Sequence, residues 1–600
     1  MSDGKRKILG LSIGQLSTAS LMVDGKIVAC VSEERFSRNK NDMSYPKNAI
    51  EYCLEMGNVK GEDLDMVALA TINEDPTSII IKRFSDFSVQ DEVRAQKEYW
   101  YPKIYENKEN DWLEIFKEKV DYDQYPGGWN KIDLNENNVY ESYKSFIHNV
   151  IFKHINVDKN KIVNIDHHTA HAMYAYFGSP FRNEDCLIFT ADACGDGISA
   201  TISTVKDGKI KRITESKTFN IARLYRYITL LLGMKPNEHE YKVMGLAPYT
   251  KPYLIKKPYE VFKETLYVDG LEFKFKIKPK DHYYYFKEKL EGCRFDGIAG
   301  GLQKYVEEIL IKWVSNTVKE TGIKKIVFSG GVAMNIKAMK EIIKLPEVAD
   351  FFVCPSGGDE SLAIGACYKT IYDVLDKNNI DMTAIKPLGV VYLGPEFLDD
   401  YIESMIKEKK LEDKYKISRN ISVKEVAQML ADGKVIGRCV GRMEFGARAL
   451  GNRSILANPK FPNIVQKINE QIKNRDFWMP FTPSMLSERV QDYLINPKKI
   501  QSPFMTIGFE TTAKAREDLP GALHPADFTA RPQFVKKEDN PEYHELIKEF
   551  ENITGVGALL NTSFNLHGYP IVMSPEDALQ VFENSDIDSI LLNSILITKK

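Results

Sequence analysis

The sequence predicts an α/β protein with a duplicated first domain and a second α/β domain after it. Three observations carry this prediction. One layout of strands and turns occurs twice, about 180 residues apart. Glycine pairs follow strand-like runs in two places, and the composition changes near residue 421. The chain has 600 residues, of which 43% are hydrophobic and 28% charged, so it is long enough for two to four ordinary globular domains.

The repeated layout is a strand, a polar turn, a strand, a tight Asp-Gly turn and a third strand. Asp24-Gly25 and Asp207-Gly208 are strong two-residue hairpin signals, and each lies between two strand-like runs. The predicted strands are 7–13, 19–23 and 26–31, and then 185–191, 198–205 and 209–214. This arrangement is typical of the actin-like ATPase fold, in which two such turns face each other across a nucleotide cleft.

The remaining segments suggest where the domains divide. A polar stretch at 376–384 ends the first half, so we expect domains at 1–385 and 386–600, the second with a helix at 423–432 and a strand at 435–440. An insertion at about 76–145 has little periodicity and is either a substrate lid or a peripheral helical decoration. The basic, aromatic segment 251–290 is either a nucleic-acid patch or, as is commoner, a solvated face with tyrosines packed below it.

Charge and cysteine usage exclude some classes of protein. The net charge of −3 and pI near 6.4 give no general drive toward nucleic acid or membrane. Eight cysteines occur without CxxC spacing, which is typical of reduced thiols in a cytoplasmic protein. No run of 18 apolar residues appears, so we expect no membrane span.

A histidine cluster is the strongest chemical signal. His167 and His171 are spaced i, i+4, which on a helix places both imidazoles on one face, as two ligands of one metal would be. An acidic, glycine-bearing turn that starts at Asp192 follows, and imidazole with carboxylate suits Fe, Zn or Mn. The alternative is a hydrogen-bonded, histidine-rich helix start.

Two strand–glycine–helix elements follow. Gly330 and Gly331 come after a strand at 325–328 and before Asn335, so the backbone there can approach phosphate or purine. The second element follows a strand at 350–353 and carries Asp359, which is placed to complete a metal set with the two histidines. Upstream, Glu240 and Lys242 either bind ribose and phosphate or form a surface ion pair.

The second domain concentrates arginines among glycines. Arginine forms bidentate hydrogen bonds with phosphate or carboxylate, and a solvated basic surface would usually carry lysines at helical spacing. We therefore expect a small anionic substrate here. Asn561 and Ser563 follow a strand at 557–560 and offer amide and hydroxyl groups. The arginines are Arg442, Arg448, Arg453, Arg475 and Arg531.

Nine segments in order resemble the O-carbamoyltransferases of antibiotic and nodulation-factor biosynthesis. They are VDGKIVACVSEERFSR, DHHTAHA, EYKVMGLAPY, GGVAMN, GGDESLAIGA, GRMEFGARALGNRS, PFTPSML, TARPQ and LLNTSFNLHGYPIV. The resemblance implies an actin-like first domain similar to the tRNA threonylcarbamoyl-transfer enzymes. It implies a YrdC-like second domain that makes carbamoyl adenylate from carbamoyl phosphate and ATP.

The resemblance also implies residue roles. His167, His171 and Asp359 would be metal ligands, with Asp192 as the fourth; the metal would be Fe²⁺, with Mg²⁺ accompanying ATP. Glu240, Lys242, Gly330, Gly331 and Asn335 would hold the nucleotide of the first domain. The five arginines would grip phosphates, and Asn561 and Ser563 would orient the carbamoyl group.

Three departures from the family pattern stand out. Gln15-Leu16 replaces a His-Asp pair, and glutamine cannot act as a base at neutral pH. We therefore expect His168, Asp192 or Asp196 to take that role. Ala447 replaces a proline of the arginine loop, which should loosen that turn only modestly. Asp527-Phe528 replaces an Asp-Gly pair, so the local backbone at those two residues is expected to differ.

The expected function is ATP-dependent carbamoyl transfer to a hydroxyl of a small natural product. The acidic, aromatic run at 91–114 would tolerate a cationic acceptor. No nucleic acid or membrane partner is expected, and a homodimer is compatible with the sequence. The alternatives are a tRNA threonylcarbamoyl-type transferase and a degenerate nucleotide-binding regulatory protein. The acceptor, the metal, the general base and the role of the insertion stay open.

Overall fold

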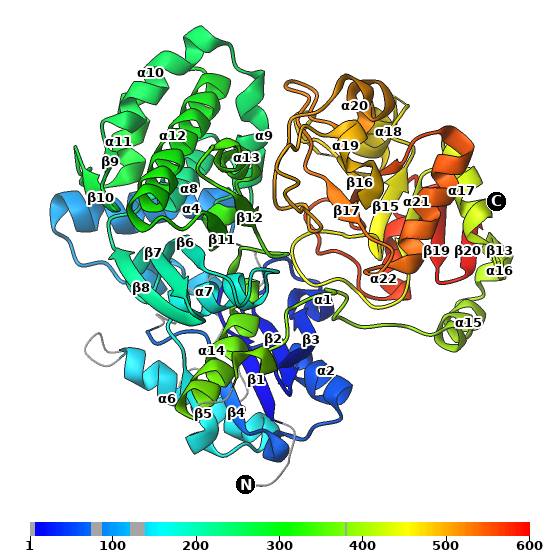
Figure 1. The fold of residues 1–600 in the computed structure, drawn as a ribbon, viewed down its shortest axis with the longest axis horizontal. Coiled ribbons are helices and arrows are strands. Elements are labelled where there is room, and N and C mark those ends of the chain that lie inside the picture. The colour runs from blue at the N-terminus through cyan, green and yellow to red at the C-terminus, as the bar shows by residue number, and fades with distance from the viewer. Residues whose placement is uncertain (1–5, 74–86, 121–138, 379–380, 462, 474) are drawn as a thin grey trace. The chain divides into compact units, whose positions relative to one another are not determined.

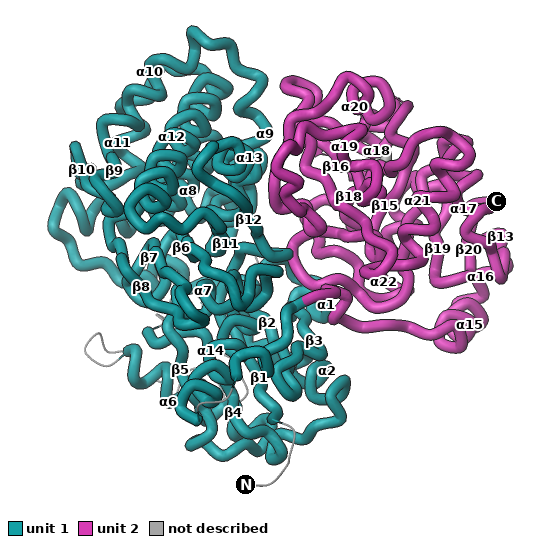
Figure 2. The backbone as a smooth tube through the Cα atoms, in the orientation of Figure 1, with its two compact units in different colours: residues 1–388 teal, residues 389–600 magenta. Residues whose placement is uncertain are grey.

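The computed structural model describes residues 6–73, 87–120, 139–378, 381–461, 463–473 and 475–600. The chain forms two compact units, residues 1–388 and residues 389–600 (Figure 2). Parts of the predicted insertion, 74–86 and 121–138, lie outside the described residues.

Unit 1 contains two five-stranded sheets with the same topology (Figure 1). In each, the first three strands form an antiparallel meander, and two further strands add in parallel beside the first. The first sheet has the order β3-β2-β1-β4-β5 and the second the order β8-β7-β6-β11-β12. The duplication predicted from the sequence is therefore present.

The strand bounds agree closely with the predicted ones. The first sheet contains β1 (Lys7–Ser12), β2 (Thr18–Val23), β3 (Lys26–Ser32), β4 (Met66–Leu69) and β5 (Ile162–Asn164). The second contains β6 (Cys186–Gly195), β7 (Ile198–Lys206), β8 (Lys209–Ser216), β11 (Lys325–Ser329) and β12 (Asp350–Phe352).

The two Asp-Gly hairpin turns have the backbone that their residue types favour. Asp24 and Gly25 have φ angles of 54° and 73°, and Asp207 and Gly208 have 50° and 73°. A two-residue turn with two positive φ angles matches the right-handed twist of the strands, and Asp-Gly adopts it at low cost. These turns therefore fix the register of both meanders.

Two helices lie between the sheets of unit 1. Helix α7 (His167–Phe177) packs on β6 and β11, and helix α14 (Leu362–Lys377) packs on β1, β2 and β4; the two helices also pack on each other. Both are buried over most of their length, as expected for helices that pack against a sheet and against each other. The first half also contains α1 (Glu34–Ser37) and α2 (Lys47–Gly57).

Insertions extend both halves of unit 1. Between β4 and β5 lie α4 (Val89–Arg94), two π-helical stretches (Ala95–Trp100 and Pro102–Glu106), α5 (Trp112–Ile115) and α6 (Val139–Ile155). Between β8 and β11 lie α8 (Ile221–Leu231), α9 (Glu240–Leu246), α10 (Pro252–Lys263), β9 (Leu266–Asp269), β10 (Glu272–Phe275), α11 (His282–Lys289) and α12 (Phe295–Thr321). Helix α13 (Ile336–Lys344) follows β11.

The basic, aromatic segment forms α10, β9, β10 and α11. Its lysines are exposed, whereas Tyr259 and Tyr283 are buried. This is the arrangement of a solvated face with tyrosines below it.

Unit 2 is built on one mixed sheet of eight strands in the order β13-β20-β19-β14-β15-β18-β16-β17. The strands are β13 (Tyr415–Ser418), β14 (Ile436–Cys439), β15 (Arg453–Ala457), β16 (Thr482–Leu486), β17 (Gln533–Val535), β18 (Ala558–Ser563), β19 (Ser589–Leu592) and β20 (Ile595–Lys599). The helices include α15 (Asp399–Glu408), α16 (Leu411–Lys414), α17 (Val423–Ala431), α18 (Ile464–Ile468), α19 (Val490–Tyr493), α20 (Ala513–Asp518), α21 (Pro541–Thr554) and α22 (Pro575–Glu583).

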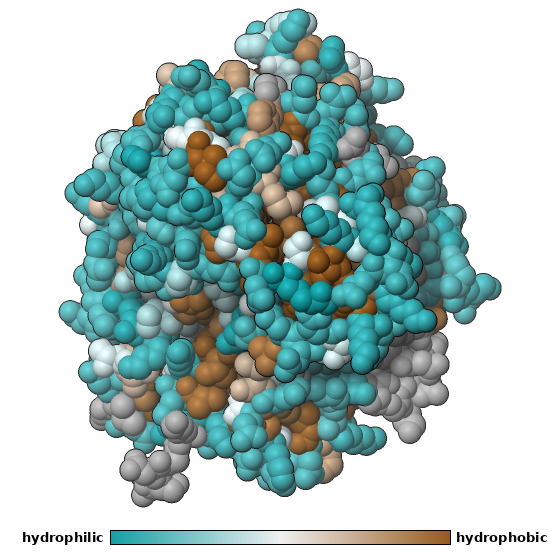
Figure 3. Space-filling model, turned by 90° about the vertical axis from the view of Figure 1, so that its right-hand side faces the viewer, coloured by the Kyte–Doolittle hydropathy of each residue, from teal (hydrophilic) through white to brown (hydrophobic). Residues whose placement is uncertain are grey.

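Unit 2 has a continuous apolar core that is built from its own residues. Ile455 of β15, Leu560 of β18 and Phe564 just after β18 pack with Phe582 of α22 and Ile406 of α15, all nearly inaccessible to water. The face drawn in Figure 3 is mostly hydrophilic, with separate hydrophobic patches. Within the described residues, every helix is too short or too polar to cross a lipid bilayer.

Candidate metal centre and arginine pocket

Helix α7 begins at the histidine cluster because Asp166 caps it. The Asp166 carboxylate accepts a hydrogen bond from the Thr169 N–H at 2.8 Å and one from the Thr169 hydroxyl at 2.6 Å. Arg212 on β8 pairs with the same carboxylate. A capped, ion-paired first turn fixes the direction in which the histidines of α7 project.

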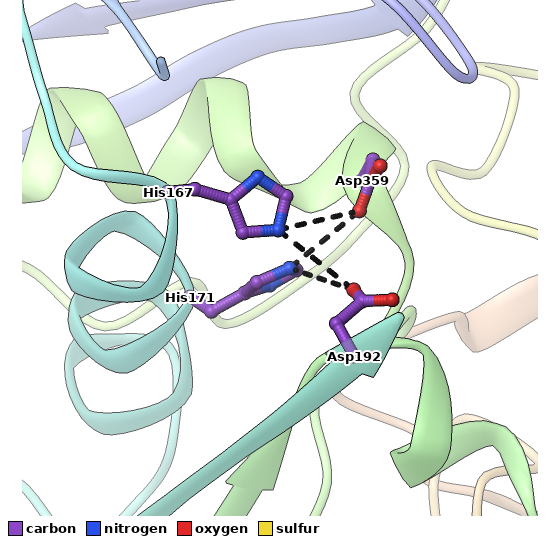
Figure 4. Close-up of side chains that lie close together, drawn as sticks. All are labelled: His167, His171, Asp192 and Asp359. Atoms are coloured by element: carbon purple, nitrogen blue, oxygen red, sulfur yellow. Dashed lines mark ion pairs between the residues drawn. The ribbon is translucent and has the colours of Figure 1, made fainter. Parts of the chain in front are cut away.

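Four side chains from three elements converge on one point (Figure 4). His167 and His171 lie one turn apart on α7, Asp192 lies on β6, and Asp359 precedes α14. The Nε2 atoms of His167 and His171 lie 3.8 and 3.4 Å from Asp192 Oδ2, and 3.8 and 3.6 Å from Asp359 Oδ1. Potential ligand atoms of all four residues lie within 4.8 Å of one another.

The donor set fits a metal ion. Both Nε2 atoms are buried and form no hydrogen bond with the described part of the chain, which would be costly if they stayed without a ligand. His171 Nδ1 lies 3.1 Å from Ser329 Oγ, so an Nδ1–H donated to that hydroxyl leaves the Nε2 lone pair directed at the carboxylates. Two imidazoles and two carboxylates suit Fe, Zn or Mn.

Glycines allow the cluster to form. An added Cβ at Gly195 would lie 2.1 Å from the His167 ring. Gly330 has a φ of 90°, and a Cβ there would lie 2.2 Å from the Ala191 carbonyl oxygen. The next residue, Gly331, donates its N–H to Asp192 Oδ2 at 3.1 Å. Gly330 therefore packs closely on β6, the strand that carries Asp192, and Gly331 orients the Asp192 carboxylate.

The electrostatics of the metal-free cluster are those of a tight ion-pair group. Burial lowers the pKa of His171, but Asp192 and Asp359 outweigh that effect and raise this pKa to about 9. The pKa of His167 is raised against burial by the same carboxylates. Burial raises the pKa of Asp192, but the two imidazoles hold it well below its usual range. A metal ion would displace protons when it binds here.

The two other residues predicted as bases are engaged inside the protein. His168 is fully buried; its Nδ1 lies 2.8 Å from the Thr190 hydroxyl and its Nε2 lies 3.0 Å from the Ile198 carbonyl oxygen. Burial lowers the pKa of His168 to about 3. This imidazole points into the core, which speaks against its predicted role as the base.

The Asp196 carboxylate accepts hydrogen bonds from backbone N–H groups on two segments. Its Oδ2 accepts the His167 N–H at 2.8 Å, and its Oδ1 accepts the N–H groups of Ile72 and Asn73 at 2.9 and 2.7 Å. The Thr71 hydroxyl donates to Oδ1 at 3.3 Å. The carboxylate thus ties α7 to the segment after β4, which is a positioning role.

The predicted nucleotide-binding residues divide into two groups. Gly330 and Gly331 lie beside the metal cluster, and Asn335 caps α13 by accepting the Ala338 N–H at 3.0 Å. Glu240 opens α9 and accepts the Asn237 N–H at 2.7 Å; burial raises the pKa of its carboxyl to about 7. Lys242, on the same helix, is buried.

Gln15 lies in the turn after β1. Its side-chain amide donates to the Asn237 carbonyl oxygen at 3.3 Å, while the Asn237 N–H binds Glu240. Gln15 therefore joins the β1–β2 turn to the loop before α9, and it supplies no titratable group there.

In unit 2, three of the five predicted arginines lie together. Burial and the neighbouring charges of Arg448 and Arg475 hold the pKa of Arg531 well below its usual range. Arg475 is oriented by Asn469 Oδ1, 2.9 Å from its Nε, and its guanidinium stacks on the Phe481 ring at 4.1 Å. Like charges held this close favour an anionic ligand between them.

The other two arginines have structural partners. Arg453 is fully buried and donates all its N–H groups to backbone carbonyls, which are those of Pro395, Val440, Gly441, Asn452 and Met573. No donor is left for a phosphate, so the geometry speaks against the predicted role of Arg453. Arg442 donates to the carbonyls of Leu393 and Gly394.

A lysine that the sequence prediction missed lies at the polar end of β18. Lys473 Nζ is buried and binds the Ser563 carbonyl, with the Ser563 hydroxyl at 3.2 Å and Asn565 Oδ1 at 2.5 Å. Asn561 is also buried; its amide donates to Ser484 Oγ at 2.9 Å. Lys473 lies two residues before Arg475, and that proximity is the one sequence signal that could have identified it.

Phe528 stands where the family pattern has a glycine, and its backbone has a conformation that glycine favours. Phe528 has a φ of 56°, in the left-handed region, and its ring is 44% exposed beneath the Arg516 guanidinium. Asp527 Oδ1 accepts the Thr529 N–H at 3.1 Å and so holds the turn that leads to Arg531. Phe528 thus lies in a backbone region that glycine adopts freely and that strains other residues.

Family models match both units. The model of the carbamoyltransferase N-terminus matches residues 7–368, and the model of the carbamoyltransferase C-terminus matches residues 427–599. Together they span most of the chain.

Curated relatives match most or all of the chain. An uncharacterised protein of Methanocaldococcus jannaschii is 31% identical over 99% of both chains, and a second one from that organism is 32% identical over 78% of this chain and 83% of its own. Nodulation protein NolNO of Sinorhizobium fredii is 30% identical over 97% of this chain and 78% of its own.

Proposed function

Since the chain belongs to the carbamoyltransferase family, we propose that it is an ATP-dependent O-carbamoyltransferase that works in two steps, one in each unit. The metal-type cluster of His167, His171, Asp192 and Asp359 carries this proposal. We further propose an actin-like fold for unit 1, a YrdC-like fold for unit 2 and a cytoplasmic location.

The first step would form carbamoyl adenylate in unit 2. Carbamoyl phosphate, ATP and water would give carbamoyl adenylate, phosphate and pyrophosphate, with Mg²⁺ accompanying ATP. The grouping of Arg448, Arg475 and Arg531 supports this assignment, because carbamoyl phosphate is a small dianion and arginine binds phosphate in a bidentate manner.

The second step would transfer the carbamoyl group in unit 1. The acceptor hydroxyl oxygen would bond to the carbamoyl carbon, the bond between that carbon and the phosphate oxygen would break, and AMP would leave. Bound Fe²⁺ would supply Lewis-acid polarisation of the carbamoyl carbonyl. Gly330 and Gly331 would hold the adenylate with their backbone, and Asp196 would keep α7 in place. The acceptor is proposed to be a small hydroxylated natural product.

The test is a turnover assay on the full chain, first without any acceptor. Carbamoyl phosphate and ATP are supplied, and the nucleotide products are resolved by mass. We expect pyrophosphate with carbamoyl adenylate or AMP. ADP with phosphate would instead indicate an ATPase, and the absence of turnover would favour a degenerate nucleotide-binding protein.

Two variants separate the steps. Arg531→Gln should lower carbamoyl phosphate consumption about 100-fold, as loss of a charged transition-state contact does, while the exposed Arg419→Gln should not. His167→Ala should abolish metal binding and transfer, yet leave adenylate formation intact. Loss of adenylate formation in His167→Ala would contradict the division of the two steps between the units.

A further inference from the structure

The four residues of the candidate metal centre are held by the protein to different degrees. Asp192 and Asp359 face the same two imidazoles at similar distances, between 3.4 and 3.8 Å (Figure 4). The two carboxylates differ in what else binds them. A ligand that is fixed before the ion arrives loses little freedom on binding, so this support decides which ligands stay on the ion and which can exchange.

The Asp192 carboxylate is held at both oxygen atoms by backbone. Its Oδ1 accepts the N–H of Ala193 at 2.6 Å, and its Oδ2 accepts the N–H of Gly331 at 3.1 Å. The Gly331 donor is itself fixed, because the preceding Gly330 packs directly on β6. Two fixed donors leave this carboxylate one orientation, with Oδ2 toward the imidazoles.

Both imidazoles are also fixed. His171 is fully buried, and its Nδ1 lies 3.1 Å from the hydroxyl of Ser329 at the end of β11. The His167 ring packs against Gly195, where an added Cβ would lie 2.1 Å away, and Asp196 accepts the His167 N–H at 2.8 Å. Neither ring can turn away without losing these contacts, so both Nε2 atoms stay directed at the same point.

Asp359 has no comparable support. Within the described part of the chain, its carboxylate has no hydrogen-bonding or oppositely charged partner besides the two imidazoles. Its side chain is 25% exposed, against 16% for Asp192. It begins a short 3₁₀ turn, Asp359–Ser361, directly after two glycines. The carboxylate can therefore swing away by a change of rotamer, without leaving any other donor unpaired.

We propose that His167, His171 and Asp192 hold the metal ion and that Asp359 is the exchangeable ligand, which gives way to the substrate. The identity of that substrate rests on the proposed function, whereas the unequal support of the four ligands does not. Asp359 is also the more exposed of the two carboxylates, so the position that it gives up is the more accessible one.

Metal binding to the full chain, prepared without metal, tests the proposal without any turnover. Co²⁺ is the probe ion, because its visible absorption reports the number and kind of its ligands. Azide, a small anionic ligand, then measures how readily one position exchanges. Asp192→Asn and Asp359→Asn remove the same charge from the two carboxylates, and Asp376→Asn, exposed on α14, is the matched control.

We expect Asp359→Asn to bind Co²⁺ within about tenfold of the wild-type affinity and to bind azide about tenfold more tightly, since no carboxylate competes for that position. Asp192→Asn should weaken Co²⁺ binding by about 100-fold, and Asp376→Asn should change neither affinity. An equal loss of Co²⁺ affinity in Asp192→Asn and Asp359→Asn, or an unchanged azide affinity in Asp359→Asn, would overturn the proposal.

Ser329→Ala is the second variant, in case Asp192→Asn does not fold. It removes the hydroxyl that supports His171 and should weaken Co²⁺ binding about tenfold without tightening azide binding. An unchanged Co²⁺ affinity would show that the support of the ligands does not decide how they bind, which also overturns the proposal. If the turnover assay gives no carbamoyl adenylate while the Co²⁺ and azide affinities change as expected, the proposed function is wrong and the unequal ligand roles stand.

Discussion

At the scale of single residues, one strained backbone conformation and one buried carboxyl group lie next to residues with proposed chemical roles. Phe528 adopts a left-handed backbone that glycine would adopt freely. Glu240 keeps a carboxyl group in a place where burial disfavours its charge. The two residues call for different tests. The strain at Phe528 depends on the presence of a Cβ atom, whereas the cost of burying the Glu240 charge depends on pH.

The strain at Phe528 is tested by two variants that both remove the ring. Phe528→Gly should be more stable than Phe528→Ala by about 1 kcal/mol, since only glycine relieves a positive φ at that position. Elsewhere in a chain alanine is usually the more stable of the two. Thermal unfolding of unit 2 measures the difference. An alanine variant as stable as the glycine variant would show that the turn relaxes without cost.

Glu240 makes stability depend on pH. Its pKa in the folded protein is raised to about 7 from a usual value near 4.5, so the neutral form favours folding. That stability is fully present below pH 4.5 and is lost as pH rises through 7. Glu240→Gln should therefore raise the midpoint of the thermal transition of unit 1 by about 2–4 °C at pH 8 and by less at pH 5. The exposed Glu288→Gln is the control; an effect independent of pH would contradict the assignment.

The sequence identifies some site residues and misses others for a physical reason. His167 and His171 are visible because helical spacing alone brings them together. Lys473 and the role of Arg453 are not visible, because their partners are remote in the chain: Ser563 for the lysine, and Pro395 and Met573 for the arginine. A guanidinium in a glycine-rich loop looks the same in the sequence whether it binds phosphate or carbonyls.

At the scale of elements, the insertion after β4 is joined to the second half of unit 1. Glu92 on α4 pairs with Arg226 on α8 at 3.4 Å, and the Tyr284 hydroxyl of α11 donates to the Gln96 carbonyl at 3.1 Å. Tyr105 of the insertion binds Asp281. The insertion therefore starts from one sheet and packs on helices that follow the other.

The Glu92–Arg226 pair should hold the insertion in place. Arg226→Met removes the cation that pairs with the buried Glu92 carboxylate, which costs about 3 kcal/mol, so protease should cleave within 87–120 much faster. The double variant Glu92→Leu/Arg226→Met removes both charges and should recover most of the resistance. Limited proteolysis with mass analysis reads out both. A double variant as sensitive to protease as the single one would show that packing, rather than the Glu92–Arg226 charge pair, holds the insertion in place.

Elements were predictable where local signals were strong. The two meanders were found from alternating residues and Asp-Gly turns, to within a few residues of their observed ends. The order of the eight strands in unit 2 was beyond sequence reasoning, because β14 pairs with β19 and β16 with β18 across long stretches of chain. Such pairings depend on packing of the whole unit and leave no periodic signal.

At the scale of the whole molecule, the chain is two units, each with its own core. Residues 389–600 hold a complete eight-stranded sheet whose apolar residues pack on helices of the same unit. A chain of this size usually unfolds in more than one step, so a single melting temperature does not describe it.

The fragment 389–600 should therefore fold alone. Calorimetry of the fragment should give one cooperative transition, and the same transition should be recognisable in the full chain after shifts of a few degrees are allowed for. Circular dichroism provides the independent check of its sheet content. A fragment without a cooperative transition would show that unit 2 needs the rest of the chain to fold.

The repeated sheet topology of unit 1 also bears on its ancestry. If the two sheets descend from one ancestral copy, β1 corresponds to β6, and the turn with Gln15 corresponds to the turn after Asp192. The metal-type residues are divided between the copies: the histidines follow the first sheet, while Asp192 and Asp359 belong to the second. Neither copy holds a complete ligand set, so the four residues meet only where the two copies pack together.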